Sequence, residues 1–262
     1  SYFLSADMAT QIAQESNDYG ITVVPLINCV GHQSWDKYTD KLLSVYPEFD
    51  ETPNLFPNNE GIYCRSWCTQ NDDVYPIIFD LVDEITDVFK TKFIHVGLDE
   101  IFLIGEDSCP RCRGIDKGDL LARAINSLYY HCVVENQLKM FMWGDRLLDG
   151  NSPSFSNYTE WDSSKSSTYT AIGKIPKDII ICDWHYDNLD TYESIPFFLE
   201  NGFCVLPTSY HDIAATKSLV RCSLLYRDNE NMLGHLYTNW GDIENKDLSK
   251  WPPMLKTIQY YW

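Results

Sequence analysis

Two carboxylates stand side by side at Asp99 and Glu100, directly after an apolar stretch at residues 93–97. The β-branched and aromatic residues of this stretch predict a buried strand, and Gly97 lets the backbone tighten where the strand ends. Adjacent acids repel one another and are partly desolvated at such a point. We therefore expect their pKa values to separate, so that one stays ionised while the other holds a proton. The pair indicates acid/base chemistry, although Asp and Glu also favour the first turn of a helix.

Cysteine is the second residue type that could do chemistry, because the chain has nine of them. Cys64 and Cys68 are separated by three residues, and Cys109 and Cys112 by two. These four thiolates could hold a tetrahedral structural zinc ion and so fix two long loops. Two disulfides are the competing interpretation if the protein is exported, and unpaired cysteines are the third.

Composition narrows the classes of function. The formal net charge of -18 and the lack of a basic cluster argue against nucleic acid and anionic membrane surfaces as partners. No apolar run reaches the roughly 20 residues of a membrane span, and residues 1–4 do not resemble a signal peptide. Eight Trp and 17 Tyr are a heavy aromatic load. Core packing absorbs some of it, and carbohydrate-binding clefts also favour aromatic residues, because their rings stack on sugar faces.

The elements that must position these residues alternate between strands and helices. Near-continuous apolar strands indicate a parallel sheet buried on both faces. A long loop rich in Pro, Asn and Asp at residues 36–73 is expected to carry function. Strands are expected at 21–28, 93–97, 140–145, 179–184, 203–207 and 233–240, and helices at 5–18, 74–90, 119–137, 191–200, 212–228 and 246–262.

This alternation predicts an α/β fold, and we favour a (β/α)8 TIM barrel. Polar and aromatic residues gather where strands end, as they do at the mouth of such a barrel. A doubly wound open sheet is the rival, but no Gly-x-Gly-x-x-Gly or phosphate-binding loop follows any strand. Because only six strands are counted, we expect residues 1–262 to form a single catalytic barrel domain that lacks its first two strands.

The motifs resemble a known family. His95-Val-Gly-Leu-Asp99-Glu100 is similar to the His-x-Gly-x-Asp-Glu signature of glycoside hydrolase family 20, the β-N-acetylhexosaminidases. The segment 24–32, which ends in Gly-His, resembles that family's preceding strand, and its spelling is nearer the hexosaminidase D-like branch. The resemblance covers roughly residues 5–245. Leu98 stands where the main family commonly has glycine, and Leu26 where it has a glutamate.

The resemblance implies a mechanism for the two acids. Most glycosidases separate their carboxylates by roughly 5–9 Å, which adjacent residues do not suit. Substrate-assisted catalysis suits them better, because the 2-acetamido oxygen of the sugar attacks the anomeric carbon and forms an oxazolinium ion. Glu100 would then be the acid/base, and Asp99 would align the acetamide through its N–H. No cofactor is implied for catalysis.

The remaining site residues are also implied by the family. His32 is expected to orient a carboxylate or to contact substrate, while His95 is interpreted as structural. The tryptophans are candidates for the walls of a sugar pocket, although buried Trp residues also simply fill cores. Tyr186 could donate to the acetamide carbonyl, and Asp145 could bind a sugar hydroxyl or cap a helix. The expected substrate-binding residues are His32, Trp143, Asp145, Trp184, Tyr186 and Trp240.

These expectations lead to one preferred function and two competitors. The preferred function is a retaining exo-β-N-acetylhexosaminidase that removes terminal GlcNAc or GalNAc, with a glycan or glycoconjugate as partner. A non-catalytic sugar-binding barrel of the same family is the first competitor, but it would have no need of the Asp99-Glu100 pair. The second is a metal-stabilised interaction module built on the cysteine loops.

Overall fold

The computed structural model describes residues 4–241, 254–255 and 258–259. The chain forms two compact units. The first consists of Ser1–Met142 and Ser167–Pro176, and the second of Trp143–Ser166 and Lys177–Trp262. Each unit is built from parallel strands joined by helices, so the predicted strand–helix alternation is confirmed.

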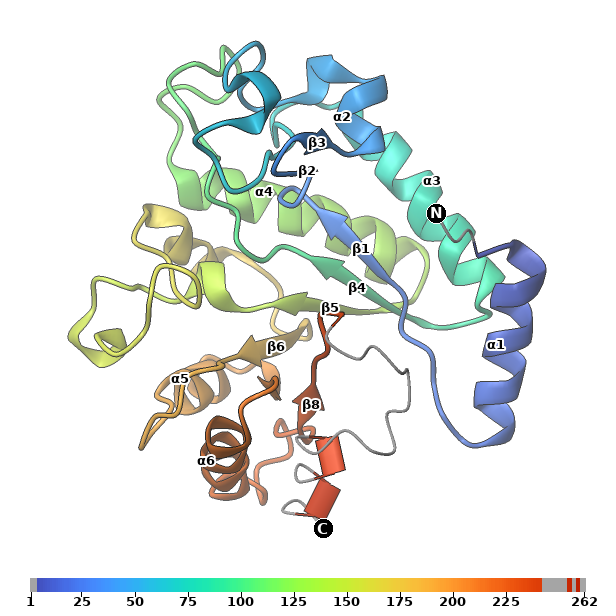
Figure 1. Ribbon diagram of the computed structural model, residues 1–262, viewed down its shortest axis with the longest axis vertical. Coiled ribbons are helices and arrows are strands. Elements are labelled where there is room, and N and C mark those ends of the chain that lie inside the picture. Colours follow the sequence, from blue (N-terminus) through green and yellow to red (C-terminus); the bar gives the residue numbers. More distant parts are fainter. Residues whose placement is uncertain (1–3, 242–253, 256–257, 260–262) are drawn as a thin grey trace. The chain divides into compact units, whose positions relative to one another are not determined.

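Parallel strands form the sheet of the first unit. Their order is β1 (Leu26–Cys29), β4 (Phe93–Gly97) and β5 (Lys139–Trp143), whose last residue falls in the second unit. Parallel pairing brings the carboxyl ends of β1 and β4 together, with Cys29 opposite Gly97. The loops that follow these two strands therefore start side by side (Figure 1).

Helices α1 (Ala6–Asp18), α3 (Val74–Val88) and α4 (Lys117–Tyr129) belong to the same unit (Figure 1). Ser5 caps α1, because its hydroxyl accepts the Met8 N–H at 3.2 Å. Helix α1 packs on α3. Helix α4 ends earlier than the predicted residue 137, because a π-helical turn, Tyr130–Glu135, follows it.

The segment between β1 and α3 is irregular, as its composition predicts. It holds the short antiparallel pair β2 (Ser34–Trp35) and β3 (Tyr38–Thr39), the one-turn helix α2 (Lys41–Val45) and two 3-10 helices, Pro47–Phe49 and Pro57–Asn59. An antiparallel bridge between Asp50 and Trp67 ties its two halves together. The segment is thus a folded excursion on the end of β1.

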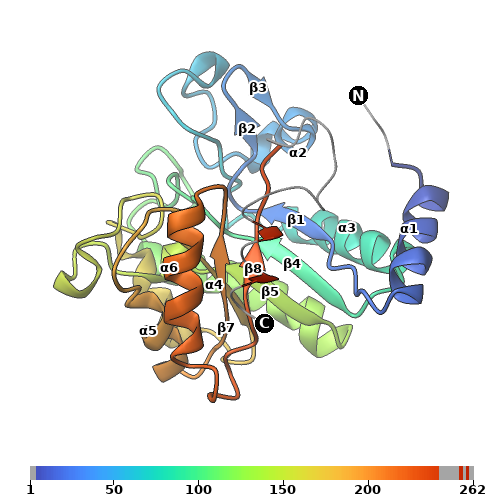
Figure 2. The ribbon, with the colours of Figure 1, turned by 60° about the horizontal axis from the view of Figure 1, so that its bottom comes forward.

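Three parallel strands form the sheet of the second unit. They are β6 (Ile180–Trp184), β7 (Cys204–Ser209) and β8 (Leu236–Tyr237), in that order. Helices α5 (Ser194–Glu200) and α6 (Ile213–Leu224) both pack against β7 (Figure 2). Strand β8 is shorter than the predicted 233–240. It begins only after Gly234, whose φ of +135° departs from strand geometry.

All six predicted strands are present, and most predicted helices lie within a few residues of their expected bounds. The closing helix predicted at 246–262 falls almost entirely outside the described residues. Within the described ranges, no helix is long and apolar enough to cross a membrane.

Candidate active site

The backbone turns sharply where β1 and β4 end. Val30 and His32 follow β1 with φ values of +65° and +56°, and Leu98 and Glu100 follow β4 with +74° and +50°. Non-glycine residues rarely adopt this left-handed region, least of all a bulky side chain such as leucine. Strained backbone of this kind concentrates at functional sites, where the surrounding structure holds it in place.

These turns bring three predicted site residues together. The His32 Nε2 atom lies 3.0 Å from Asp99 Oδ2 and 3.3 Å from Glu100 Oε2. His32 is buried, and the two carboxylate side chains are only 14% and 15% exposed. One imidazole therefore bridges both acids, and all three side chains are largely shielded from solvent.

The charge of His32 follows from this contact. Burial opposes a charged imidazole, but the hydrogen bonds and negative charges of Asp99 and Glu100 outweigh it and raise the pKa of His32 to about 10. The ring is an imidazolium at neutral pH. Its positive charge stabilises negative charge on the carboxylates that it contacts.

The two carboxylate oxygens of Asp99 differ in their contacts. Its Oδ1 atom is buried and has no hydrogen-bond partner among the described residues, while Oδ2 is bound to His32. A buried acceptor without a donor is costly and rare, so it marks a place where a donor is expected to bind. Gly31 lets the two strand-end loops approach, because a Cβ atom there would lie 3.1 Å from the Asp99 carbonyl oxygen.

Tyr63 is a site residue that the sequence did not reveal. Its hydroxyl hydrogen-bonds the Glu100 side chain, and burial together with the charge of Glu100 raises the pKa of Tyr63. The Tyr63 ring makes edge contacts with three other rings, 5.8 Å from His32, 5.7 Å from Trp35 and 5.9 Å from Phe102. No spacing rule links Tyr63 to Glu100, because they lie in different loops.

His95 is structural, as expected from its place inside β4. It is buried, and its Nδ1 atom accepts the Gly97 N–H at 3.0 Å. Burial lowers the pKa of His95 to about 4, so the ring is neutral. His95 is thus neutral, whereas His32 is charged.

The other predicted substrate-binding residues lie in the second unit and contact one another. Trp184 donates from Nε1 to Asp145 Oδ1 at 3.2 Å, and Arg146 Nε lies 2.7 Å from Asp145 Oδ2. Asp145 is the first residue of a short 3-10 helix, Asp145–Leu147, rather than its cap. Its carboxylate is therefore held by an indole and a guanidinium.

Two further aromatic residues extend this cluster. Trp240 donates from Nε1 to the Tyr186 hydroxyl at 2.9 Å, and its ring centroid lies 6.1 Å from that of Trp143. Trp143 is buried and Trp240 is 55% exposed. The Trp240 ring is thus partly exposed to solvent, whereas Trp143 has the burial of a core residue.

His185 lies between Trp184 and Tyr186 in the chain, and no sequence motif singles it out. Its ring is fully buried between Asp162, 3.0 Å from Nδ1, and Asp183, 3.1 Å from Nε2. Burial opposes its charge, but the two carboxylates raise the pKa of His185 to about 9. This buried ion network fixes the end of β6, from which the aromatic residues project.

The expected set of four cysteines is wrong in one member. Cys68, Cys109 and Cys112 come together with Glu51, and their ligand atoms all lie within 4.8 Å of one another. Cys64 points elsewhere, with its Sγ 3.4 Å from the His32 backbone nitrogen. Residues 64–68 have no turn between them, and an extended chain separates residues four apart by about 13 Å. Cys64 and Cys68 therefore cannot both be ligands of one metal ion.

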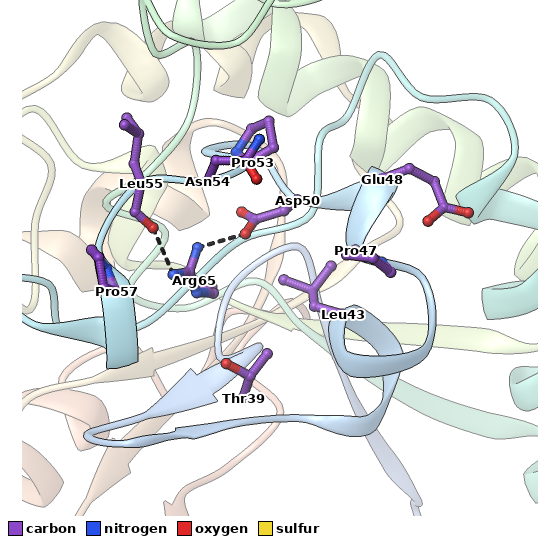
Figure 3. A pocket seen from close by; sticks show the side chains of 10 residues that line it. All are labelled: Thr39, Leu43, Pro47, Glu48, Asp50, Pro53, Asn54, Leu55, Pro57 and Arg65. Carbon is purple, nitrogen blue, oxygen red and sulfur yellow. Dashed lines mark hydrogen bonds and ion pairs between the residues drawn. The ribbon is translucent and has the colours of Figure 1, made fainter.

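The structure also contains a pocket of about 630 Å³ that is separate from the acids (Figure 3). It is lined by residues between 39 and 65, and none of the predicted site residues borders it. Arg65 lies in it but is already bound, with Nη1 2.5 Å from Asp50 Oδ2 and Nη2 donating to two backbone carbonyls. The Asp50 carboxylate in its lining is therefore already paired with a guanidinium.

Comparisons with known proteins identify what the chain resembles. Residues 1–252 match the model of "Glycosyl hydrolase family 20, catalytic domain". The chain is 22% identical over 280 residues to a Beta-hexosaminidase of Porphyromonas gingivalis, covering 100% of the chain and 34% of that protein. It is 33% identical over 109 residues to a Lacto-N-biosidase of Bifidobacterium bifidum, covering 40% of the chain and 8% of that protein. The chain thus spans about a third or less of these relatives.

Solved structures agree on the fold. The chitobiase of Flavobacterium johnsoniae superposes with a TM-score of 0.70 at 18% identity, over 100% of this chain and 38% of that one. A β-N-acetylhexosaminidase from Bacteroides fragilis gives a TM-score of 0.62 at 18% identity, over 99% and 51% of the two chains. The predicted fold class, part of a (β/α)8 barrel, is confirmed. With the family model matched over nearly the whole sequence, the chain belongs to glycosyl hydrolase family 20.

Proposed function

We propose that the chain is a retaining exo-β-N-acetylhexosaminidase that hydrolyses terminal β-linked GlcNAc or GalNAc by substrate-assisted catalysis. One observation carries the proposal. Asp99 and Glu100 share a single imidazolium, while Asp99 Oδ1 is buried without a partner among the described residues. An acetamide N–H is a donor that would satisfy this oxygen, and membership of the family supports the same class of substrate.

The proposed reaction has two steps. First, the acetamide carbonyl oxygen bonds to the anomeric carbon while the glycosidic bond breaks, and Glu100 gives its proton to the leaving oxygen. Asp99 accepts the acetamide N–H and stabilises the positive charge of the oxazolinium ion. Second, water attacks the anomeric carbon and gives a proton to Glu100, and the acetamide is restored. Two displacements retain the anomeric configuration, and neither step needs a cofactor.

His32 and Tyr63 have positioning roles in this scheme. The imidazolium of His32 touches both carboxylates at 3.0 and 3.3 Å, so it fixes their separation as charge moves between them. Tyr63 donates to Glu100 and limits the rotation of its side chain. A positioned acid/base group raises the rate by roughly 10²–10⁴-fold, and this gain depends on the contacts that hold Glu100 in place.

We assign sugar contacts to the aromatic cluster of the second unit as part of the proposal. Trp240 has an exposed ring, and the Tyr186 hydroxyl is held in place because Trp240 Nε1–H donates to it and it lies 3.2 Å from the Thr238 hydroxyl, whose own proton goes to the Ser209 carbonyl. Apolar walls with a few oriented polar groups suit a pyranose with an acetamide methyl. The proposed substrate contacts are His32, Trp143, Asp145, Trp184, Tyr186 and Trp240.

The test compares two aryl substrates that differ only at C2. We expect hydrolysis of the aryl N-acetyl-β-glucosaminide and none of the plain β-glucoside, because only the first carries the internal nucleophile. Comparable turnover of the glucoside would overturn the mechanism. Binding of N-acetylglucosamine without turnover of either substrate would instead indicate the non-catalytic sugar-binding barrel.

Two variants test the assigned roles. Glu100→Gln should lower kcat by about 10²-fold or more while substrate still binds, because it removes the proton donor. Asp99→Asn should be impaired on the N-acetyl substrate, since an amide cannot stabilise the oxazolinium charge. The exposed Glu60→Gln serves as the matched control and should behave as wild type. Wild-type turnover by either active-site variant would refute its role.

A further inference from the structure

A cluster of three thiols and one carboxylate lies outside the proposed reaction. Cys68, Cys109, Cys112 and Glu51 are all at most 1% exposed. Cys68 Sγ lies 3.6 Å from Cys109 Sγ and 3.2 Å from Cys112 Sγ, and Cys112 Sγ lies 3.1 Å from Glu51 Oε2. We propose that these four side chains bind one structural zinc ion.

The spacing of the four atoms fits a tetrahedral ion. A zinc ion about 2.3 Å from each sulfur gives tetrahedral edges of about 3.8 Å, and a shorter bond to oxygen shortens the remaining edges slightly. The observed contacts of 3.1–3.6 Å lie near these edges. A disulfide would need two sulfurs at about 2.0 Å and would leave the third thiol and the carboxylate without a role.

The donor set also selects the metal. Thiolate is a soft ligand that favours zinc over magnesium or calcium, and three sulfurs with one carboxylate oxygen complete a closed tetrahedron without an open position. Such a site is structural rather than catalytic. It contains no atom of His32, Asp99 or Glu100, so it is separate from the proposed hydrolytic centre.

Hydrogen bonds around the cluster orient each ligand. The backbone N–H groups of Arg111 and Cys112 donate to Cys109 Sγ, and that of Gln70 donates to Cys68 Sγ. Arg111 Nε lies 3.4 Å from Cys68 Sγ, which places a cation beside the sulfurs. Outer contacts of this kind fix the geometry of metal ligands and balance the excess negative charge of thiolates.

Glu51 is prepared for the role of fourth ligand. Its Oε1 atom accepts the Glu106 N–H at 3.0 Å, which leaves Oε2 directed at Cys112 Sγ. The backbone nitrogen of Glu51 donates to the Ser66 carbonyl at 3.0 Å, and that of Cys68 donates to the Phe49 carbonyl at 2.7 Å. Backbone hydrogen bonds therefore hold the two ligands of this loop in position without the help of a metal.

The site would tie together the two loops that carry the acids. Glu51 and Cys68 belong to the loop after β1, which also holds His32 and Tyr63, and the Cys109–Cys112 turn belongs to the loop after β4, which begins at Asp99-Glu100. A zinc ion between them would join these long segments at a second point beyond the strand ends. Closing long loops in this way stabilises the folded state.

The test is the metal content of the purified protein, measured by mass spectrometry of the eluted metal and independent of hydrolysis. We expect one zinc per chain, and a cobalt-substituted form with thiolate-to-cobalt charge-transfer absorption. Cys109→Ser should reduce that absorption by about a third, because one of three sulfurs is lost. Glu51→Gln should weaken zinc binding by tenfold or more while the absorption per bound cobalt is kept.

Cys64→Ser and Cys222→Ser are the matched controls, and both should keep one zinc and the full cobalt absorption. If the ligand variants fail to fold, a thiol-specific mercurial added to the wild-type protein should still release one zinc, detected with a chromogenic chelator. Absence of metal with all thiols open to alkylation would overturn the proposal. A mass lower by two hydrogens, showing a disulfide, would do so as well, and so would loss of zinc in Cys64→Ser.

Discussion

His32 and Asp99 form a buried ion pair across the ends of two neighbouring parallel strands, with 3.0 Å between His32 Nε2 and Asp99 Oδ2. They are 67 residues apart in the sequence. The pair forms because β1 and β4 are hydrogen-bonded in parallel and both chains turn sharply at the same edge of the sheet. The acid that follows Asp99 in the sequence then meets the same imidazole.

The first prediction concerns pH. The pKa of His32 is about 10 in the folded state and about 6.5 when unfolded. The resulting stabilisation is fully present below pH 6.5, declines as the pH rises and is lost above about pH 10. Replacing His32 by Asn should remove this part of the pH dependence, seen as a smaller loss of unfolding free energy between pH 7 and 10. Denaturant titrations of both proteins at each pH would measure it, and equal slopes would contradict it.

The second prediction concerns the hydroxyl of Tyr63. Tyr63→Phe keeps the ring contacts with His32 and Trp35 but removes the hydrogen bond to Glu100. A hydrogen bond to a charged group contributes about 1.5–3 kcal/mol, so kcat/KM should fall by about tenfold or more. The pH–rate profile should also shift, which a purely structural effect would not cause. Tyr38→Phe, at a residue that is 53% exposed, should leave both unchanged.

The third prediction concerns the close approach at Gly31. An added Cβ would lie 3.1 Å from the Asp99 carbonyl and 3.3 Å from Ile101 Cγ1, so Gly31→Ala should push the acid loop outward. We expect kcat/KM to fall with only a modest loss of thermal stability, about 1–3 kcal/mol. Gly173→Ala is the control, because a Cβ there meets nothing within 4 Å. Similar activity in both variants would show that the approach is not required.

The fourth prediction opposes two effects at Leu98. Glycine would relieve the left-handed φ of +74°, worth about 1–2 kcal/mol. It would also remove a side chain that is 1% exposed, and deletion of a buried leucine costs about 2–5 kcal/mol. The loss is larger, so Leu98→Gly should lower the unfolding free energy. A more stable variant would mean that the side chain contributes less than its burial indicates.

The strands and the position of the two acids can be predicted from the sequence. Apolar runs and helical periodicity predict the six strands, and the position of Asp99-Glu100 after a strand predicts acids at a sheet edge. These signals are local and periodic, so they survive without knowledge of the fold. The Ser5 and Asp212 helix caps are predictable for the same reason.

Other contacts depend on how distant loops pack. Tyr63 reaches Glu100, and Glu51 replaces Cys64 beside the other cysteines, only because the excursion after β1 folds back through the Asp50–Trp67 bridge. The spacing of Cys64 and Cys68 predicts that both bind one metal ion. Spacing alone does not reveal whether the backbone between them turns. The extended backbone there decides the matter.

The left-handed residues at the two strand ends set a conflict for engineering. Val30 is wholly buried, as Leu98 nearly is, yet each holds a backbone shape that glycine or asparagine would adopt more easily. At Leu98 the buried side chain outweighs this strain, so selection for heat resistance should retain leucine there, whereas a smaller residue accepted at Val30 would change the turn that carries His32. A thermostable library would therefore have to be sorted for hydrolysis of the proposed substrate as well. Positions where the two criteria disagree would be those at which the backbone shape serves the proposed reaction.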